Sequence, residues 1–337
     1  MAISGSDIDT KGERPTLKTI AFMTGLGVTT VSRALKDAPD IGADTKERVR
    51  LVAKQIGYRP NRAGVRLRTG KTNVIALILN THEEIMGFSS QIIYGISEVL
   101  AQTPYHLVVT PYSHSADPME PVRYVVETGS ADGVIISRTE PNDPRVRYLM
   151  EHDFPFVTHG RTDMGVAHPY HDFDNHAFAR KCVEALAAKG RRRLALLPPT
   201  PDLTYFRHMT SGFSEAVREL GLDEVSLPGI HIDLSLAEIK SAMAQALSGR
   251  QRPDGIVCGS SGAVIAVVAA IEELGLGLGR DVDVYSKQSM NILPWFRKEI
   301  GVFNEDVRAA GRELARAVIG HIDGKPATAL QSVSGLE

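Results

Sequence analysis

The stretch from Thr16 to Leu35 constrains this chain most, because it has the pattern of two short helices joined by a tight corner. Apolar residues recur at helical spacing up to Thr24, the segment 24–27 interrupts them, and the helical pattern resumes at Val28. Gly25 suits a corner position that requires a positive φ. The residues expected to form a small core between the two helices are Ile20, Ala21, Leu26, Val31 and Leu35. The stretch therefore predicts a helix-turn-helix.

The second helix of this pair would present a small, polar, singly basic surface. Its outward residues are Val28, Thr29, Thr30, Ser32 and Arg33. Such a surface suits a DNA major groove, where threonine methyls meet thymine methyls and arginine reaches guanine or phosphate. A third helix is expected over 46–56, with Thr45 as its N-cap and Gly57 at its end. The prediction is a three-helix bundle. Many pairs of amphipathic helices separated by glycine bind nothing, so the surrounding sequence must decide between the two interpretations.

Charge is distributed unevenly along the chain. Residues 1–72 hold 14 Lys and Arg against 7 Asp and Glu, whereas the remaining residues hold 24 against 33. A basic head on an acidic body is typical of a protein that presents one end to nucleic acid. A solvated charged face would give a milder asymmetry, so this pattern supports the DNA-binding interpretation without proving it.

The segment from Thr16 to Thr72 resembles the lactose-repressor/galactose-repressor (LacI/GalR) family of bacterial transcription regulators, through the pattern TLKTIA…TGLGV.TVSRAL…T.ERV…A…GYRPN…L….T. The resemblance implies that the second helix reads operator bases. It also implies that the segment after GYRPN becomes a hinge helix when two subunits lie side by side on DNA, with Leu67 wedged into the minor groove. By position, Val28, Thr29 and Arg33 would read bases, and the further DNA-binding residues would be Thr16, Leu17, Thr30, Ser32 and Asn61.

Two departures from the family pattern affect this DNA-binding segment. The serine that usually caps the recognition helix is replaced by Gly27, which weakens the cap and removes a phosphate contact. The usual Ala-Arg pair of the hinge helix is Gly64-Val65, and glycine lowers helix propensity by about 1 kcal/mol relative to alanine. We therefore expect DNA binding with a hinge that forms less readily.

From Asn73 onward, buried strands and amphipathic helices alternate. Strands are expected at 74–79, 106–110, 133–136, 154–157, 194–197, 228–231, 255–258 and 282–285, and helices at 92–100, 118–128, 144–152, 176–189, 207–220, 235–248 and 262–274. About ten such units are too many for one sheet, so they predict an α/β core of two doubly wound parallel-sheet lobes. The resemblance extends to this part, which is similar to the periplasmic-binding-protein-like, sugar-binding core of the same regulators.

These patterns divide the chain as follows: a flexible tail at 1–14, a helix-turn-helix domain at 15–59, a hinge helix or linker at 60–72, and a ligand-binding and dimerisation core at 73–337. Within the core, lobe N is expected at about 73–171 and 302–325, and lobe C at about 172–301 and 326–337. A recognition helix reads only a half-site, so a homodimer is expected.

Small ligands of open α/β sheets bind beyond the carboxyl ends of the strands. The hydrogen-bonding and aromatic residues that follow the predicted strands are Asn80, His82, Tyr112, Arg138, His159, Arg161, His171, Asp174, Tyr205, Arg207, Ser260, Ser261, Lys287, Gln288 and Trp295. Such a set is typical of a polyol pocket. Each residue alone has a simpler explanation, because loop His and Arg are more often solvated or capping, and a Trp often fills a core gap.

The pocket also departs from the family. The arginine that usually holds a sugar hydroxyl falls on Met209, with Arg207 two positions away. Ser260-Ser261 replaces the family's usual Asn-Asp pair, and Lys287-Gln288-Ser289 replaces its Asp-rich turn. A further Asp of the family pattern is replaced by His159. Because acids are replaced by neutral or basic groups, the pattern favours an oligosaccharide, a sugar acid or a sugar phosphate over a plain neutral monosaccharide.

The sequence thus predicts a transcriptional regulator, most simply a repressor, whose affinity for double-stranded operator DNA is controlled by a small sugar-like effector. The alternatives are a solute-binding protein, which would need a signal peptide, and an α/β enzyme. No Walker, GxSxG or HExxH motif is present, and the glycine-rich 275–279 follows a helix rather than a strand. With two cysteines and no metal-spaced His cluster, no cofactor, metal or disulfide is expected. No membrane span or signal peptide is apparent, so a cytoplasmic location is expected.

Overall fold

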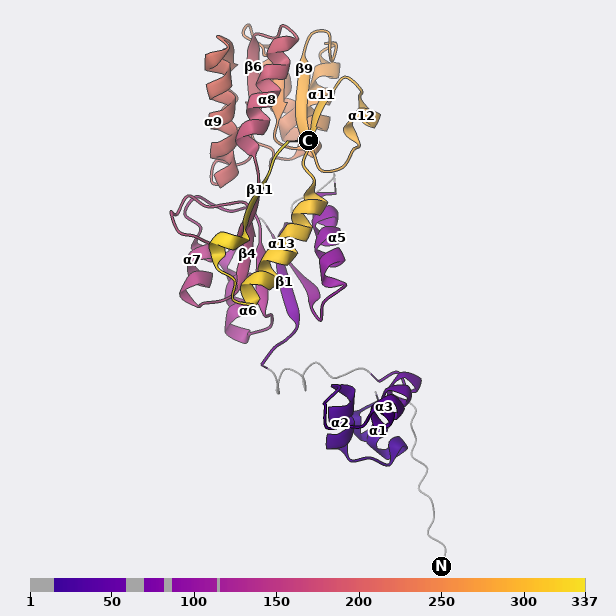
Figure 1. Ribbon diagram of the computed structural model, residues 1–337. Coiled ribbons are helices and arrows are strands. Elements are labelled where there is room, and N and C mark those ends of the chain that lie inside the picture. Colours follow the sequence, from indigo (N-terminus) through magenta and orange to yellow (C-terminus); the bar gives the residue numbers. More distant parts are fainter. Residues whose placement is uncertain (1–14, 59–69, 82–86, 114–115, 337) are drawn as a thin grey trace, which may run out of the picture. The chain divides into compact units, whose positions relative to one another are not determined.

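The computed structural model describes residues 15–58, 70–81, 87–113 and 116–336, and the chain divides into two compact units, Met1–Thr72 and Asn73–Glu337 (Figure 1). The hinge segment around Gly64, Val65 and Leu67 lies outside the described residues, as do the candidates Asn61 and His82. In the described part of the chain, no helix is long and apolar enough to cross a membrane.

The first unit contains α1 (Leu17–Thr24), α2 (Val28–Leu35) and α3 (Ala43–Gln55). Gly25 ends α1 with a φ of 67°, as the corner requires. The buried core consists of Ile20, Ala21, Val31, Ala34, Val49 and Ala53, with Leu26 and Leu35 packed at its edge. The predicted helix-turn-helix is therefore confirmed. The expected start of the third helix was wrong, because α3 begins at Ala43 with Gly42 rather than Thr45 at its N-cap.

The second unit contains two parallel sheets, each flanked by helices. The lobe N sheet has the strand order β11-β5-β4-β3-β1-β2, and the lobe C sheet has the order β10-β9-β8-β6-β7. Lobe N comprises β1 (Val74–Thr81), α5 (Phe88–Leu100), β2 (His106–Ser113), α6 (Met119–Thr128), β3 (Gly133–Ile136), α7 (Pro144–Glu151), β4 (Phe156–His159), β5 (Tyr170–Phe173), α13 (Val307–Ile322), η1 (Ala327–Leu330) and β11 (Gln331–Ser334). Lobe C comprises α8 (Asn175–Ala188), β6 (Arg193–Leu197), α9 (Thr204–Glu219), β7 (Asp223–Val225), α10 (Leu236–Ser248), β8 (Gly255–Cys258), α11 (Ser261–Glu273), β9 (Asp283–Gln288), α12 (Leu293–Phe296) and β10 (Gly301–Asn304).

The apolar runs identified in the sequence form the centres of both sheets. Every residue of β3 and β8 is buried, which is typical of strands covered by helices on both faces. Helices α5 and α13 approach each other closely at two glycines. A Cβ on Gly95 would lie 2.0 Å from the Arg308 carbonyl oxygen, and one on Gly311 would lie 2.4 Å from that of Ile92. The two lobes predicted from the sequence are thus confirmed, and Figure 1 shows α13 lying along lobe N.

Two of the expected segments were placed wrongly. The expected strand at 228–231 is not one, because Pro228 has no N–H to donate and Gly229 turns the chain with a φ of 72°; the strand is β7, at 223–225. The C-terminal segment 326–337 was assigned to lobe C, but β11 pairs with β5 in the lobe N sheet. Conversely, 302–304 belong to β10 in lobe C. The strands β5, β10 and β11 carry polar residues, so their sequences lack a clear apolar run.

The chain crosses between the lobes after β5, after β10 and after β11. The first and third crossings lie side by side, because the amide of Asp174 donates to the Ser334 carbonyl at 3.0 Å. In the second crossing, the amide of Glu305 donates to the Gln288 carbonyl at 2.9 Å. These crossings bring the carboxyl ends of the strands of both sheets toward the same cleft.

Candidate functional site

The exposed face of α2 carries the residues predicted to contact DNA. Val28, Thr29 and Arg33 are exposed, and Thr30 and Ser32 are half-buried. The Arg33 guanidinium lies 2.5 Å from the Asp40 carboxylate, and both side chains remain about half exposed. A polar surface with one arginine is thus open to a partner.

Residues beside this face anchor the two helices. Thr16 caps α1 in a capping box with Thr19, and Leu17 packs at the edge of the three-helix core. Gly27 is the N-cap of α2 and makes no side-chain hydrogen bond there. The predicted place of Gly27 at the cap of this helix is therefore confirmed, and the weakening of the cap stays a prediction.

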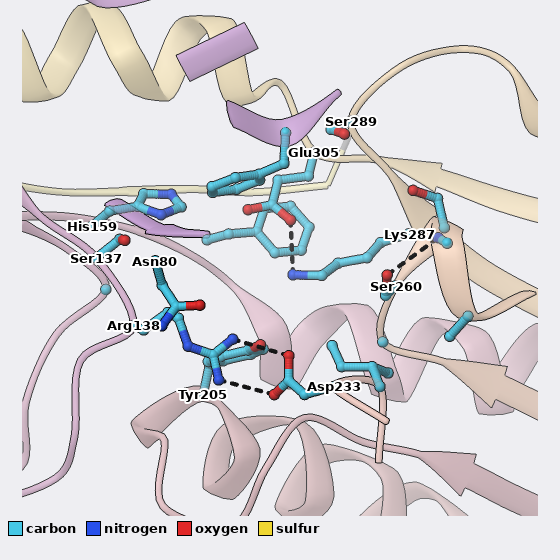
Figure 2. Close-up of a pocket in the computed structure, with 18 of the residues that line it drawn as sticks. Asn80, Ser137, Arg138, His159, Tyr205, Asp233, Ser260, Lys287, Ser289 and Glu305 are labelled. Atoms are coloured by element: carbon cyan, nitrogen blue, oxygen red, sulfur yellow. Dashed lines mark hydrogen bonds and ion pairs between the residues drawn. The ribbon is translucent and has the colours of Figure 1, made fainter. Parts of the chain in front are cut away.

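Between the lobes lies a cavity of 280 Å³ at the carboxyl ends of the strands. Eight residues singled out in the sequence line it: Asn80, Arg138, His159, Tyr205, Ser260, Ser261, Lys287 and Gln288. Figure 2 labels six of these residues, together with Ser137 and Glu305, and shows their side chains converging from both lobes. A cavity of this kind, with a few fixed polar groups, is suited to a small polar ligand.

Lys287 lies at the base of the cleft, where lobe C meets the crossing at Glu305. Its ammonium lies 2.8 Å from the Glu305 carboxylate and donates to Asn175 Oδ1 at 3.0 Å. The rings of Phe173 and Tyr205 cover it at 5.2 and 5.4 Å. Although burial acts to raise the pKa of Glu305, the charge of Lys287 holds that pKa below its ordinary value. The two groups therefore form a buried ion pair.

A second ion pair spans the cleft directly. Arg138 follows β3 in lobe N, and Asp233 lies between β7 and α10 in lobe C. The guanidinium donates two hydrogen bonds to the carboxylate, at 3.0 and 2.9 Å, in bidentate geometry. Figure 2 shows the two side chains pointing toward each other beside Tyr205.

Three further polar groups of the cleft have a shifted pKa or lack a hydrogen-bond partner. Removal from water lowers the pKa of His159 to about 4, so its ring is neutral at pH 7. Burial raises the pKa of Asp172 to about 6, even though Arg161 lies 2.9 Å from it. Asn80 Oδ1 is buried and has no hydrogen-bond partner among the described residues. An acceptor in this position needs a donor from a ligand or from water.

Asp172→Asn is expected to stabilise the protein by about 1 to 3 kcal/mol at pH 7.5. The folded protein binds the Asp172 proton more tightly than the unfolded chain does, so stability falls as pH rises from about 4 to about 6. Asparagine removes this penalty, which is complete above pH 6. Denaturant titrations at several pH values measure the effect, with the exposed carboxylate variant Asp163→Asn as control. Lower stability of Asp172→Asn at pH 7.5 would contradict the account.

The other described candidates do not line the cleft. Trp295 is 86% exposed on α12, and Arg207 is exposed and lies 3.2 Å from Asp163. His171 bonds Ser332 at 2.9 Å, and Asp174 caps α8. Arg161 acts on the cleft only through Asp172, and Tyr112 packs against the lobe N core. Met209 is fully buried, so the position of the usual family arginine belongs to the core of lobe C.

Sequence reasoning missed several residues that the structure brings into the site. Asp233 lies in the loop before α10, directly after the segment that was wrongly expected to be a strand at 228–231, but it was not counted among the candidates that follow strands. Glu305 follows β10 and precedes the cap of α13, two elements that the sequence reading did not predict. Asp172 and Phe173 end β5 and Asn175 begins α8, so these three residues flank the first crossing between the lobes. A search for polar residues at every lobe crossing would have found most of them.

Comparisons with known proteins agree with this architecture. Residues 16–61 match the family described as bacterial regulatory proteins, lacI family, and residues 183–335 match the periplasmic binding protein-like domain. The HTH-type transcriptional regulator AglR of Rhizobium meliloti (strain 1021) is 31% identical over 317 residues, covering 91% of this chain and 87% of that protein. A transcriptional regulator CelR–cellobiose complex aligns with a TM-score of 0.70 at 24% identity, over 96% of this chain and 98% of that one. The lac repressor dimer bound to operator and the anti-inducer ONPF aligns with a TM-score of 0.83 at 19% identity, over 96% and 97%.

Proposed function

The chain belongs to the lacI family of bacterial regulatory proteins, and we propose that it is a homodimeric repressor whose operator affinity is set by a small sugar-like effector bound between its lobes. Membership of this family makes it a DNA-binding transcriptional regulator rather than an enzyme. The identity of the effector, the oligomeric state and the repressing role are the finer parts of the proposal.

The polar face of α2 supports the DNA-binding half of the proposal. Val28, Thr29 and Arg33 are exposed on a helix whose other face is fixed to α1 and α3. A single helix of this length reads a half-site, so two copies are needed for a full operator. The lac repressor structure with similar fold is a dimer bound to operator.

The cleft between the lobes is the single observation that carries the proposal of a bound effector. Its cavity is enclosed by residues of both lobes and holds a buried acceptor, Asn80 Oδ1, without a partner among the described residues. Aromatic rings of Phe88, Phe173 and Tyr205 lie along the same cavity. Fixed hydrogen-bonding groups beside aromatic faces suit a sugar, and the similar CelR structure is a cellobiose complex.

Regulation follows from binding by two lobes at once. A ligand that contacts both lobes favours one lobe arrangement and shifts the population toward it. If that arrangement changes the spacing of the two DNA-binding units in a dimer, operator affinity changes with it. The direction of the change, induction or co-repression, depends on which arrangement fits the operator.

A thermal-shift screen of the full chain tests the effector proposal. The panel contains neutral mono- and disaccharides, sugar acids and sugar phosphates. A ligand that binds only the folded state raises the melting temperature in a concentration-dependent way. We expect at least one sugar to raise it, and no rise across the panel would contradict a sugar effector while leaving DNA binding untouched.

A further inference from the structure

The charged groups of the cleft are arranged in matched pairs. Arg138 and Lys287 are the cations among the described residues that line the cavity, and each lies within 3.0 Å of a carboxylate, that of Asp233 or Glu305. The third lining carboxylate, Asp172, pairs with Arg161. An incoming anion would therefore meet no unopposed positive charge in the described part of the cleft.

In the ion pair between Arg138 and Asp233, here called the bridge, the position of Arg138 is fixed by its surroundings. Arg138 has a φ of 55°, which is rare and unfavourable for a residue other than glycine. Its carbonyl accepts a hydrogen bond from Arg145 Nη2 at 2.8 Å. Arg145 is 2% exposed, and its side chain donates two hydrogen bonds to the Asp143 carboxylate. A strained backbone fixed by a buried network indicates that the position of this guanidinium matters.

The bridge keeps hydrogen-bonding capacity for a ligand. A guanidinium has five N–H donors, and Asp233 uses two of those of Arg138. The remaining N–H groups of Arg138 can donate to the oxygen atoms of sugar hydroxyls.

We propose that Asp233 makes the cleft selective for neutral sugars, by neutralising Arg138 and repelling carboxylate or phosphate groups while the bridged pair binds ligand hydroxyls. This inference rests on the proposed sugar effector and narrows its chemical class. It reverses the part of the sequence-based preference that favoured sugar acids and sugar phosphates, because that part did not take Asp233 and Glu305 into account. Specificity would come from a repulsive element placed against the wrong ligand.

Asp233→Asn tests the proposal, since the amide keeps the shape and one acceptor but removes the charge. Dissociation constants are measured on the full chain for a neutral disaccharide series and for glucose 6-phosphate, gluconate and glucuronate. For the wild type we expect a neutral sugar to bind at least 100-fold more tightly than any anionic one. In Asp233→Asn, we expect that ratio to fall at least tenfold.

Two further variants separate charge from structure. Asp163→Asn removes a carboxylate from an exposed ion pair with Arg207 that also joins the two lobes, and should leave the ratio unchanged. Asp233→Glu keeps the charge and should keep the exclusion of anionic sugars. Should Asp233→Asn fold poorly, Asp233→Ser is the replacement, judged by the same ratio.

An unchanged ratio in the charge-removing variant, or a wild-type preference for an anionic sugar, would overturn the inference and leave the sugar-effector proposal standing. If the wild type binds none of the sugars, both the selectivity inference and the sugar-effector proposal are overturned. This outcome is distinguishable because it is measured on the wild type alone.

Discussion

Replacing Lys287 by methionine is expected to destabilise the two-lobed unit by about 3 to 5 kcal/mol, because it leaves the buried carboxylate of Glu305 without its counter-charge. The two side chains are only 13% and 10% exposed. The wild-type pair holds the pKa of Glu305 low, so its contribution to stability is present above the ordinary pKa of a glutamate and is lost as pH falls through the lower folded value. Without the Lys287 charge, burial raises the pKa of Glu305, so the variant should lose this dependence and become less stable as pH rises.

Calorimetry of the full chain measures this effect, as a fall in the melting temperature of the larger unit of roughly 6 to 15 °C. Lys240→Met is the matched control, because Lys240 lies 2.5 Å from Glu273 in an exposed pair that should contribute little. The double variant Lys287→Met, Glu305→Gln should recover much of the loss, since both charges are then removed. A loss no larger than that of Lys240→Met would contradict a buried pair.

Arg33→Ala is expected to weaken operator binding by about 1 to 3 kcal/mol for each half-site and to relax the base preference at one position of each half. The reason is that Arg33 is the only arginine on the described exposed face of α2. On DNA its guanidinium would exchange Asp40 for a base edge or a phosphate. Fluorescence anisotropy with operator variants measures both the loss and the relaxed preference.

Arg48→Ala is the control for the loss of one positive charge, because Arg48 is exposed on α3. It should weaken binding to operator and to random DNA alike, and reduce the salt dependence of both. Equal losses of Arg33→Ala on operator and random DNA would show that Arg33 contacts only phosphates.

The helix-turn-helix could be predicted from the sequence because its determinants are local. Gly25 lies at the required positive φ, and Ile20 and Val31 follow helical spacing within one short stretch. The central strands could be predicted for a similar reason, since β3 and β8 are uninterrupted apolar runs. A strand that is buried on both faces is apolar along its whole length, so it can be recognised from its own sequence.

The cleft was predicted only in part, because its key contacts join residues far apart in the chain. Arg138 was a candidate in the sequence, yet its charge balance depends on Asp233, 95 residues later. Lys287 likewise was a candidate, whereas its partner Glu305 lies in a crossing that no apolar run marks. The replacement of acids by neutral or basic groups favoured an oligosaccharide, a sugar acid or a sugar phosphate, whereas the ion pairs with Asp233 and Glu305 support the proposal of a neutral sugar.

The most direct test of the account measures operator affinity with and without an effector on the same protein. A preferred duplex is selected from randomised DNA with the full chain, and its dissociation constant is measured by anisotropy, with random DNA in parallel. We expect a two-fold symmetric preferred site, and a sugar that stabilises the core to change affinity for that site at least tenfold without changing affinity for random DNA. A core-stabilising sugar that leaves operator affinity unaltered would contradict the coupling between cleft and DNA on which the account depends.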